Sequence, residues 1–316
     1  MNDVRIAFFG SPLLALRCLE ELCGSLDVRL VVTRPDKRSG RGKKIHTTPV
    51  KSFAVTRGIE VCQPLKPDES LMERLRELGI DLVVVVAYGR ILPEGLLDLP
   101  SLGCLNLHAS LLPRYRGPSP IEAALLNGDS GTGITLQKMA PGMDEGDILD
   151  SCRIPIGSED NAEDLLASIA DSAPAFVTRS VRDYIAGGTT PKKQNEYEAT
   201  YCSLIRKEDG LIRWREPGSA VLRKIRAYAV WPVAYTAFRG KRLRIYRASL
   251  TKDDKGSDAP PGTVLCADGK RGIRIATGDG SIDLVELQPE NRKRMHFSEF
   301  VNGYREIEGE VLGENP

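Results

Sequence analysis

An asparagine and a histidine stand two residues apart at the end of an apolar run, in the segment LNLHASLLPRYRGPSP (105–120). Residues i and i+2 of a β-strand point to the same face, so a strand here places Asn106 and His108 side by side. An amide N–H and an imidazolium can both donate hydrogen bonds to a developing tetrahedral oxygen. The pair therefore indicates stabilisation of an oxyanion.

A carboxylate that could orient or charge His108 follows in the segment APGMDEGDIL (140–149), where Asp144 is the candidate. The glycines of this segment allow tight or left-handed turns that carry a side chain inward. The carboxylate can hold an imidazolium or take a proton from an attacking amine. Ser110 lacks the G-x-S-x-G surroundings of a nucleophile. We therefore expect direct acyl transfer between two bound substrates, although each feature taken singly is more often structural.

Predicted strands and helices alternate along the first half of the chain, and they could position these side chains. Such alternation is typical of an α/β domain with a mostly parallel sheet. Open sheets of this kind bind ligands at the carboxyl ends of their strands, where His108 is expected. The turn after the first strand reads GSP rather than G-x-G-x-x-G, so no dinucleotide site is predicted. Strands are predicted at 4–10, 28–33, 81–89, 103–108 and 133–139, and helices at 13–25, 71–79, 121–128 and 161–185.

The pattern changes after AGGTTPKKQ (186–194), where short alternating runs are separated by Gly, Asp and Pro. Such runs are typical of a small antiparallel β-barrel or sandwich, with one helix expected at 219–228. We predict a Rossmann-like domain over 1–188, a linker over 189–205 and a small β-barrel resembling an oligonucleotide-binding (OB) fold over 206–316. Trp214 and Trp231 are expected in the core of the barrel.

Composition narrows the class of protein. The 316 residues are 41% hydrophobic and 28% charged, as in ordinary soluble proteins. The apolar runs are too short to span a bilayer, and the N-terminus has no basic segment followed by a long apolar one. Seven cysteines without a Cys-x-x-Cys pair and only three histidines argue against a metal site. We expect a cytoplasmic protein with reduced thiols and no metal.

The net charge of +1 conceals an uneven distribution. Residues 191–316 hold 23 Lys and Arg against 18 Asp and Glu, whereas residues 1–190 hold 21 against 25. Residues 206–247 hold 12 basic against 3 acidic side chains. This distribution indicates a polyanionic partner, and on composition alone a solvated basic surface is the alternative.

The segment NLHASLLPRYRG (106–117), followed by MAPGMDEGDIL (139–149), resembles the folate-dependent formyltransferases, and within them the branch that formylates methionyl-tRNA. The likeness runs nearly end to end and includes FGSP (9–12), VVVVAYGRILP (83–93) and AYAVWPVAY (227–235). It implies that Asn106 and His108 stabilise the oxyanion while Asp144 keeps His108 charged and assists proton transfer. The folate-site residues that it implies are Ser110, Leu111, Leu112, Pro113, Tyr88, Gly89, Ile91 and Leu92.

The resemblance also implies both substrates. The family branch transfers a formyl group from 10-formyltetrahydrofolate to the amino group of methionine on initiator methionyl-tRNA, without a metal, for translation initiation. The segment TRPDKRSGRGKK (33–44), which holds six basic residues and one acidic, would be a mobile loop that enters the acceptor arm. Its candidate tRNA contacts are Arg38, Arg41, Lys43 and Lys44. A monomer without membrane contact is expected.

The second half of the chain supplies further basic residues that could follow a phosphate backbone. These are Arg223, Lys224, Arg226, Arg239, Lys241, Arg242 and Arg244. Two other readings stay open: a formyltransferase that acts on a purine intermediate or an amino-sugar nucleotide, and a non-catalytic RNA-binding protein with a degenerate α/β domain. The basic loop weighs against the first, and the intact Asn106, His108 and Asp144 set weighs against the second.

Overall fold

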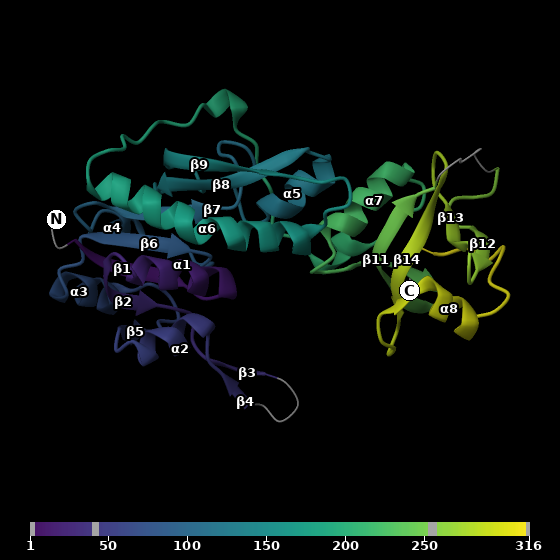
Figure 1. Ribbon diagram of the computed structural model, residues 1–316, viewed down its shortest axis with the longest axis horizontal. Coiled ribbons are helices and arrows are strands. Elements are labelled where there is room, and N and C mark those ends of the chain that lie inside the picture. The colour runs from purple at the N-terminus through teal and green to yellow at the C-terminus, as the bar shows by residue number, and fades with distance from the viewer. Residues whose placement is uncertain (1–3, 40–43, 252–257, 314–316) are drawn as a thin grey trace. The chain divides into compact units, whose positions relative to one another are not determined.

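The computed structural model describes residues 4–39, 44–251 and 258–313, which fall into two compact units. The first unit comprises the chain up to Gly117, Gly131–Pro155 and Ala167–Cys202. The second comprises Pro118–Ser130, Ile156–Leu166 and the chain from Ser203 onward. Each unit is described by itself (Figure 1).

A seven-stranded sheet forms the centre of the first unit, in the order β5-β2-β1-β6-β7-β8-β9 (Figure 1). The first five strands in that order are parallel, and β8 and β9 are antiparallel to their neighbours. The predicted mostly parallel α/β sheet is therefore confirmed. The strands are β1 (Arg5–Gly10), β2 (Asp27–Val32), β5 (Glu60–Cys62), β6 (Leu82–Val86), β7 (Cys104–His108), β8 (Gly131–Lys138) and β9 (Asp147–Pro155).

Burial explains where the apolar residues of this sheet and its helices lie in the sequence. All five residues of β6, LVVVV, are buried, as expected of a parallel strand covered on both faces. Helix α3 (Glu69–Glu77) buries Leu71 and Leu75 four residues apart, and Asp68 caps its first turn by accepting from the Leu71 N–H. The other helices here are α1 (Leu13–Cys23), α2 (Pro49–Thr56), α4 (Glu94–Leu97) and α6 (Ala162–Ile185), with the 3₁₀-helix η1 (Glu196–Glu198).

The basic segment after β2 contributes two short strands. Strands β3 (Lys37–Ser39) and β4 (Lys44–His46) pair with each other in antiparallel register. The flanks of the expected loop therefore form a short hairpin, and residues 40–43 lie outside the described part of the chain.

The second unit contains an antiparallel sheet in the order β10-β11-β14-β13-β12, with β15 added beside β14. Its edge strands β10 and β12 both bond to the C-terminal segment: Ala237 pairs with Gly313, and Val264 exchanges hydrogen bonds with Gly309 and Glu310. This segment covers both open edges, which is how a small barrel removes them. The strands are β10 (Ala234–Phe238), β11 (Lys241–Leu250), β12 (Val264–Asp268), β13 (Gly272–Ala276), β14 (Ser281–Pro289) and β15 (Met295–His296).

Helices complete the second unit. They are α5 (Pro120–Asn127), α7 (Gly218–Ala227), α8 (Phe297–Gly303) and the 3₁₀-helix η2 (Lys207–Gly210). Helix α7 confirms the helix predicted at 219–228. Trp214 is buried in the core and its indole N–H donates to Thr236 Oγ1 at 3.0 Å. The prediction for Trp231 was wrong: its side chain is 53% exposed, because it lies in the turn between α7 and β10.

In the described part of the chain, no helix is both long and apolar enough to cross a membrane. The seven cysteines carry free thiols. Among the described residues, no three His, Cys, Asp or Glu side chains gather where they could hold a metal ion.

Substituting Leu82→Ala should lower the free energy of unfolding of the first unit by about 2–5 kcal/mol, because the side chain is fully buried in β6 and its removal leaves a cavity. Urea denaturation would measure the change. Leu65, which is 75% exposed, is the matched control, and Leu65→Ala should change stability by less than about 0.5 kcal/mol. Equal effects of the two substitutions would contradict this description of the core.

Candidate active site

His108 ends strand β7 with its ring buried and both ring nitrogens facing oxygen atoms. Nε2 donates to the Tyr115 carbonyl at 2.9 Å, and Nδ1 lies 3.5 Å from Asp144 Oδ1. A carbonyl and a carboxylate are both acceptors, so the two contacts are complete only when both nitrogens carry protons. The surroundings of His108 therefore suit the imidazolium cation.

Asp144 lies in the loop between β8 and β9 and has a positive φ of 55°. Its Oδ1 accepts from Gln137 Nε2 at 2.8 Å, and its Oδ2 accepts from the Gly117 N–H at 2.9 Å. These donors fix the carboxylate beside His108. The structure thus brings together the two residues that the sequence placed in separate segments.

Gln137 is a residue of the site that the sequence analysis missed. It lies on β8 directly opposite Asn106, and two residue pairs further along, Thr135 lies opposite His108. Besides donating to Asp144, Gln137 accepts from the Gly146 N–H at 3.1 Å, so it holds both sides of the Asp144 loop. The signal was the i, i+2 spacing of Thr135 and Gln137 on a strand, which becomes informative only when the strand pairing is known.

Asn106 shares the face of β7 with His108, as predicted, and its side chain is partly exposed. Its side-chain amide makes no hydrogen bond to any residue in the described part of the chain, in contrast to the side chains of His108 and Asp144. A side-chain amide that is free beside an imidazolium can donate to an oxygen atom of a bound molecule.

The first of the two predicted folate segments is fixed next to this site. Thr135 Oγ1 accepts from the Leu112 N–H at 3.1 Å and donates to the Ser110 carbonyl at 2.7 Å. Ser110 is buried, and its hydroxyl donates to the Arg114 carbonyl at 2.6 Å. The backbone from Ser110 to Pro113 is therefore attached to β8 beside His108.

The second folate segment follows the neighbouring strand β6, and its residues differ in exposure. Tyr88 and Leu92 are buried in the core, whereas Ile91 is 84% exposed. Arg34 donates to the carbonyls of Tyr88 and Gly89 at 3.0 and 3.3 Å. This segment can therefore offer a ligand its backbone and the Ile91 side chain, rather than the Tyr88 ring.

The candidate tRNA contacts in the basic segment are only partly placed. Arg38 lies in β3 and Lys44 lies in β4. Arg41 and Lys43 lie outside the described residues. These four therefore stay predictions.

Four of the seven basic candidates in the second unit bind other groups of the protein. Arg223 donates to the Leu126 carbonyl and Lys224 to the Leu211 carbonyl. Arg226 donates to the carbonyls of Gly157 and Asp160, and Arg239 forms an ion pair with Glu310. Their positive charges serve the packing of the unit itself.

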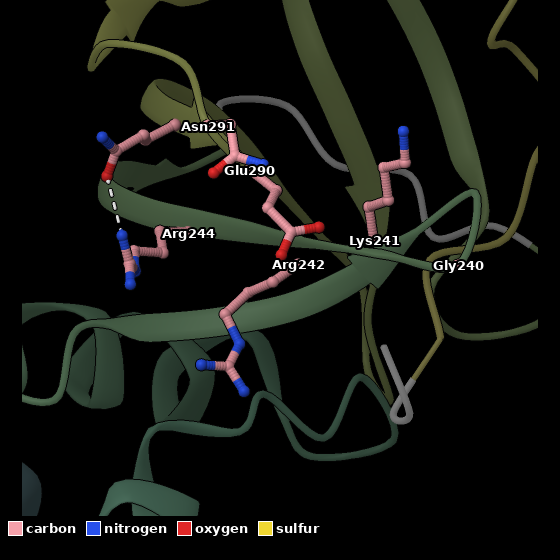
Figure 2. A pocket seen from close by; sticks show the side chains of 7 residues that line it. Gly240, Lys241, Arg242, Arg244, Glu290 and Asn291 are labelled. Carbon is pink, nitrogen blue, oxygen red and sulfur yellow. Dashed lines mark hydrogen bonds between the residues drawn. The ribbon is translucent and has the colours of Figure 1, made fainter.

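The other three, Lys241, Arg242 and Arg244, line one pocket of about 470 Å³ along β11 (Figure 2). Lys241 and Arg244 are exposed, and Arg244 donates to Gln288 Oε1 at 3.2 Å. The Arg242 guanidinium lies 4.2 Å from the centre of the Tyr235 ring. Glu290 also lines the pocket, but among the described residues it forms no ion pair with these three cations, so the pocket presents a basic surface (Figure 2).

Comparison with known families decides the class. The formyl transferase family matches residues 4–181, and the C-terminal domain of formyl transferases matches residues 204–305.

The chain belongs to the formyl transferase family.

Curated relatives and solved structures agree with this membership. The chain is 41% identical to a methionyl-tRNA formyltransferase of Geobacter sulfurreducens over 99% of this chain and 98% of the relative. It is 39% identical to the enzyme of that name from Carboxydothermus hydrogenoformans, over 98% and 99%. Its fold is similar to that of an N-formyltransferase from Helicobacter canadensis (TM-score 0.68, 20% identity, 92% of this chain and 100% of the other), whose structure holds folinic acid and dTDP-3-aminofucose. The chain is thus an enzyme of the formyl transferase family.

Replacing Gln137 by Glu should lower the turnover of this formyl transferase at least 100-fold, because a second carboxylate would face Asp144 in place of an amide donor. Steady-state formyl transfer would measure the loss. Gln288, which contacts Arg244 in the other unit, is the matched control, and Gln288→Glu should leave turnover within about two-fold at saturating substrate. Full turnover of the Gln137→Glu variant would show that Asp144 does not need this donor.

Proposed function

We propose that the chain transfers the formyl group of 10-formyltetrahydrofolate to the amino group of methionine on initiator methionyl-tRNA, in the cytoplasm, for translation initiation. The observation that carries the proposal is the meeting of Asn106, His108 and Asp144 at the end of β7, in a chain similar over 98–99% of its length to methionyl-tRNA formyltransferases. The proposal includes residues 1–188 as the catalytic domain, 189–205 as a linker and 206–316 as the tRNA-binding domain.

The proposed reaction is a direct acyl transfer. The methionine nitrogen attacks the formyl carbon, and the carbonyl oxygen becomes an oxyanion. The Asn106 amide, which has no partner in the described part of the protein, donates to that oxygen. The His108 imidazolium stabilises its charge, with the Nε2 proton shared between the oxyanion and the Tyr115 carbonyl.

The remaining steps balance the protons. As the intermediate collapses, the bond between the formyl carbon and the folate nitrogen breaks. The attacking nitrogen loses a proton and the leaving folate nitrogen gains one. Asp144, held by Gln137 and Gly117, keeps His108 charged and assists this transfer.

The proposed folate site lies where β6 and β7, which are parallel neighbours, end at the same edge of the sheet. Ser110, Leu111, Leu112 and Pro113 would form one side and the backbone of Tyr88, Gly89, Ile91 and Leu92 the other. The attachment of the first segment to Thr135 and of the second to Arg34 supports a preformed site.

An amino-sugar nucleotide is the second candidate acceptor, because the Helicobacter canadensis relative covers the whole fold and holds such a compound. The identity of this chain to that relative is 20%, against 41% to the methionyl-tRNA formyltransferase of Geobacter sulfurreducens. An identity of 20% supports a shared fold and says nothing about the substrate, so we favour methionyl-tRNA as the acceptor.

Formyl transfer from 10-formyltetrahydrofolate should be observed with methionyl initiator tRNA and not with an amino-sugar nucleotide. Asn106→Ala and His108→Ala should each lower turnover by about 10²–10³-fold, since each removes one source of oxyanion stabilisation. Asn302, which is exposed in α8, provides the control Asn302→Ala, with turnover unchanged. Transfer to the sugar nucleotide alone would reverse the choice of substrate, and full turnover of either site variant would remove that residue from the mechanism.

Replacing Lys241 and Arg244 together by Ala should raise KM for the tRNA about tenfold and leave turnover at saturating tRNA unchanged. These side chains would meet phosphates in the basic pocket on β11 (Figure 2). The slope of log affinity against log salt should also fall by about one per lost contact, measured by filter binding at several salt concentrations. The double variant Lys270→Ala and Arg305→Ala, which removes two exposed cations elsewhere in the same unit, is the control for net charge. An equal change with the control would show that only total charge matters.

A further inference from the structure

Arg116 is fully buried, although the proposed reaction does not use it. It lies in the loop that follows His108, between Tyr115, which accepts from His108, and Gly117, which donates to Asp144. A buried cation is costly unless its charge and its N–H groups are paired. The groups that pair with Arg116 therefore indicate which part of the structure its buried charge stabilises.

The side-chain hydrogen bonds of Arg116 go to residues of the segment 194–201, which the sequence analysis treated as a linker. Glu145 Oε1, next to Asp144, also lies 3.9 Å from Nη1. The guanidinium donates to both carboxylate oxygens of Glu196 at 2.6 and 2.9 Å. Its Nε–H donates to Gln194 Oε1 at 3.0 Å, and one Nη1–H donates to the Tyr201 hydroxyl at 2.9 Å. The planar fork of arginine fits this set of acceptors, which a lysine could not satisfy.

The Glu196 contact is stable across the neutral range. Hydrogen bonding to Arg116 lowers the pKa of Glu196 below its ordinary value of 4.5, and the same contact raises the pKa of Arg116. A lowered carboxyl pKa stabilises the folded state above pH 4.5, and this contribution is lost as the pH falls through the lowered pKa. At neutral pH both groups are charged.

Gln194 carries the contact on to the loop of Asp144. Its side-chain amide donates to the carbonyl oxygens of Asp144 and Gly146, both at 2.7 Å. Asp144 has a left-handed backbone, with φ 55°, which residues other than glycine rarely adopt because the conformation is strained. Two hydrogen bonds from one fixed amide hold that conformation.

The same segment also fixes the opposite side of the site. The Arg116 N–H donates to the Thr200 carbonyl, and the Cys202 N–H donates to the Arg116 carbonyl, both at 2.8 Å. The Tyr115 N–H donates to Thr200 Oγ1 at 2.8 Å. The backbone that contacts His108 and the loop that carries Asp144 are thus tied to one stretch of chain.

We propose that Arg116 and Gln194 are positioning residues for formyl transfer, and that they hold Asp144 against His108 through segment 194–201. This proposal rests on the catalytic role proposed for Asp144. Neither residue contacts the reacting atoms. Arg116 fixes Gln194, and Gln194 fixes the backbone carbonyls of Asp144 and Gly146.

The variant Gln194→Met tests the proposal, because it keeps the length of the side chain and removes both donors and the acceptor. Its kcat should fall tenfold to 100-fold, since small displacements of a catalytic group have effects of this size. KM for 10-formyltetrahydrofolate and for methionyl-tRNA should stay within two-fold. Tyr197, whose side chain is fully exposed in the same segment, provides the control Tyr197→Ala, with kcat unchanged.

A double-mutant cycle with Asp144→Ala separates positioning from general destabilisation. If Gln194 acts through Asp144, the double variant should be no slower than Asp144→Ala alone. An equal further loss in that background would overturn the proposal, and so would full kcat of Gln194→Met. Normal kcat of Asp144→Ala would instead refute the proposed mechanism, so the two failures are distinguishable.

Two further variants keep the test decisive if Gln194→Met fails to fold. Gln194→Asn keeps the amide but is one methylene too short to reach both Arg116 and the loop carbonyls, so kcat should fall in the same range. Arg116→Lys keeps the positive charge but lacks the planar guanidinium, so it should lower kcat with little change in KM for either substrate. Wild-type kcat in either folded variant would overturn the proposal.

Discussion

The antiparallel pairing of β8 with β7 places Gln137 opposite Asn106 and Thr135 opposite His108, and the geometry of the site depends on this register. Because successive residues of a strand face opposite sides of the sheet, a shift of one residue would turn Thr135 and Gln137 to the face opposite that of Asn106 and His108. With the observed register, Thr135 holds the segment after His108, and Gln137 holds the loop of Asp144. One strand therefore aligns both segments that carry the chemistry.

The site also shows how a folded chain holds an imidazole and a carboxylate together with little exposure to water. His108 is 6% exposed and the Asp144 side chain 17% exposed. Each is surrounded by groups of the correct polarity: acceptors around the imidazole and donors around the carboxylate. Preorganised groups of this kind need little rearrangement when charge develops on a substrate. The Asn106 amide is the exception. It has no hydrogen-bond partner among the residues that the structure describes, so a bound molecule can use it.

Buried and exposed arginines serve different purposes in this protein. Arg116, Arg223 and Arg226 donate to carbonyls or side chains of their own unit, where an arginine joins several acceptors at once. Lys241 and Arg244 line an open pocket and can meet an external anion (Figure 2). The number of basic residues therefore overstates the positive charge available to a polyanion, because some of these side chains are bonded to groups of the protein itself.

The sequence by itself determined the class of fold and the three side chains of the proposed reaction. The apolar run LVVVV requires a strand covered on both faces, and the i, i+2 spacing of Asn106 and His108 requires a shared face. These are local constraints of the chain, so they can be read without knowing what the segments contact. The resemblance in the same segments pointed to the family that the comparisons show.

Only the tertiary structure decided which groups hold those side chains. Gln137 joined the site through strand pairing, and Arg116 and Gln194 joined the Asp144 loop through contacts between segments about 50 and 80 residues apart. Trp231 was expected in the core and is half exposed, because the turn before β10 carries it outward. Local patterns give the face of a strand and the ends of a helix. They do not give the partners of a polar side chain, since hydrogen bonds between distant segments exist only after the chain has folded.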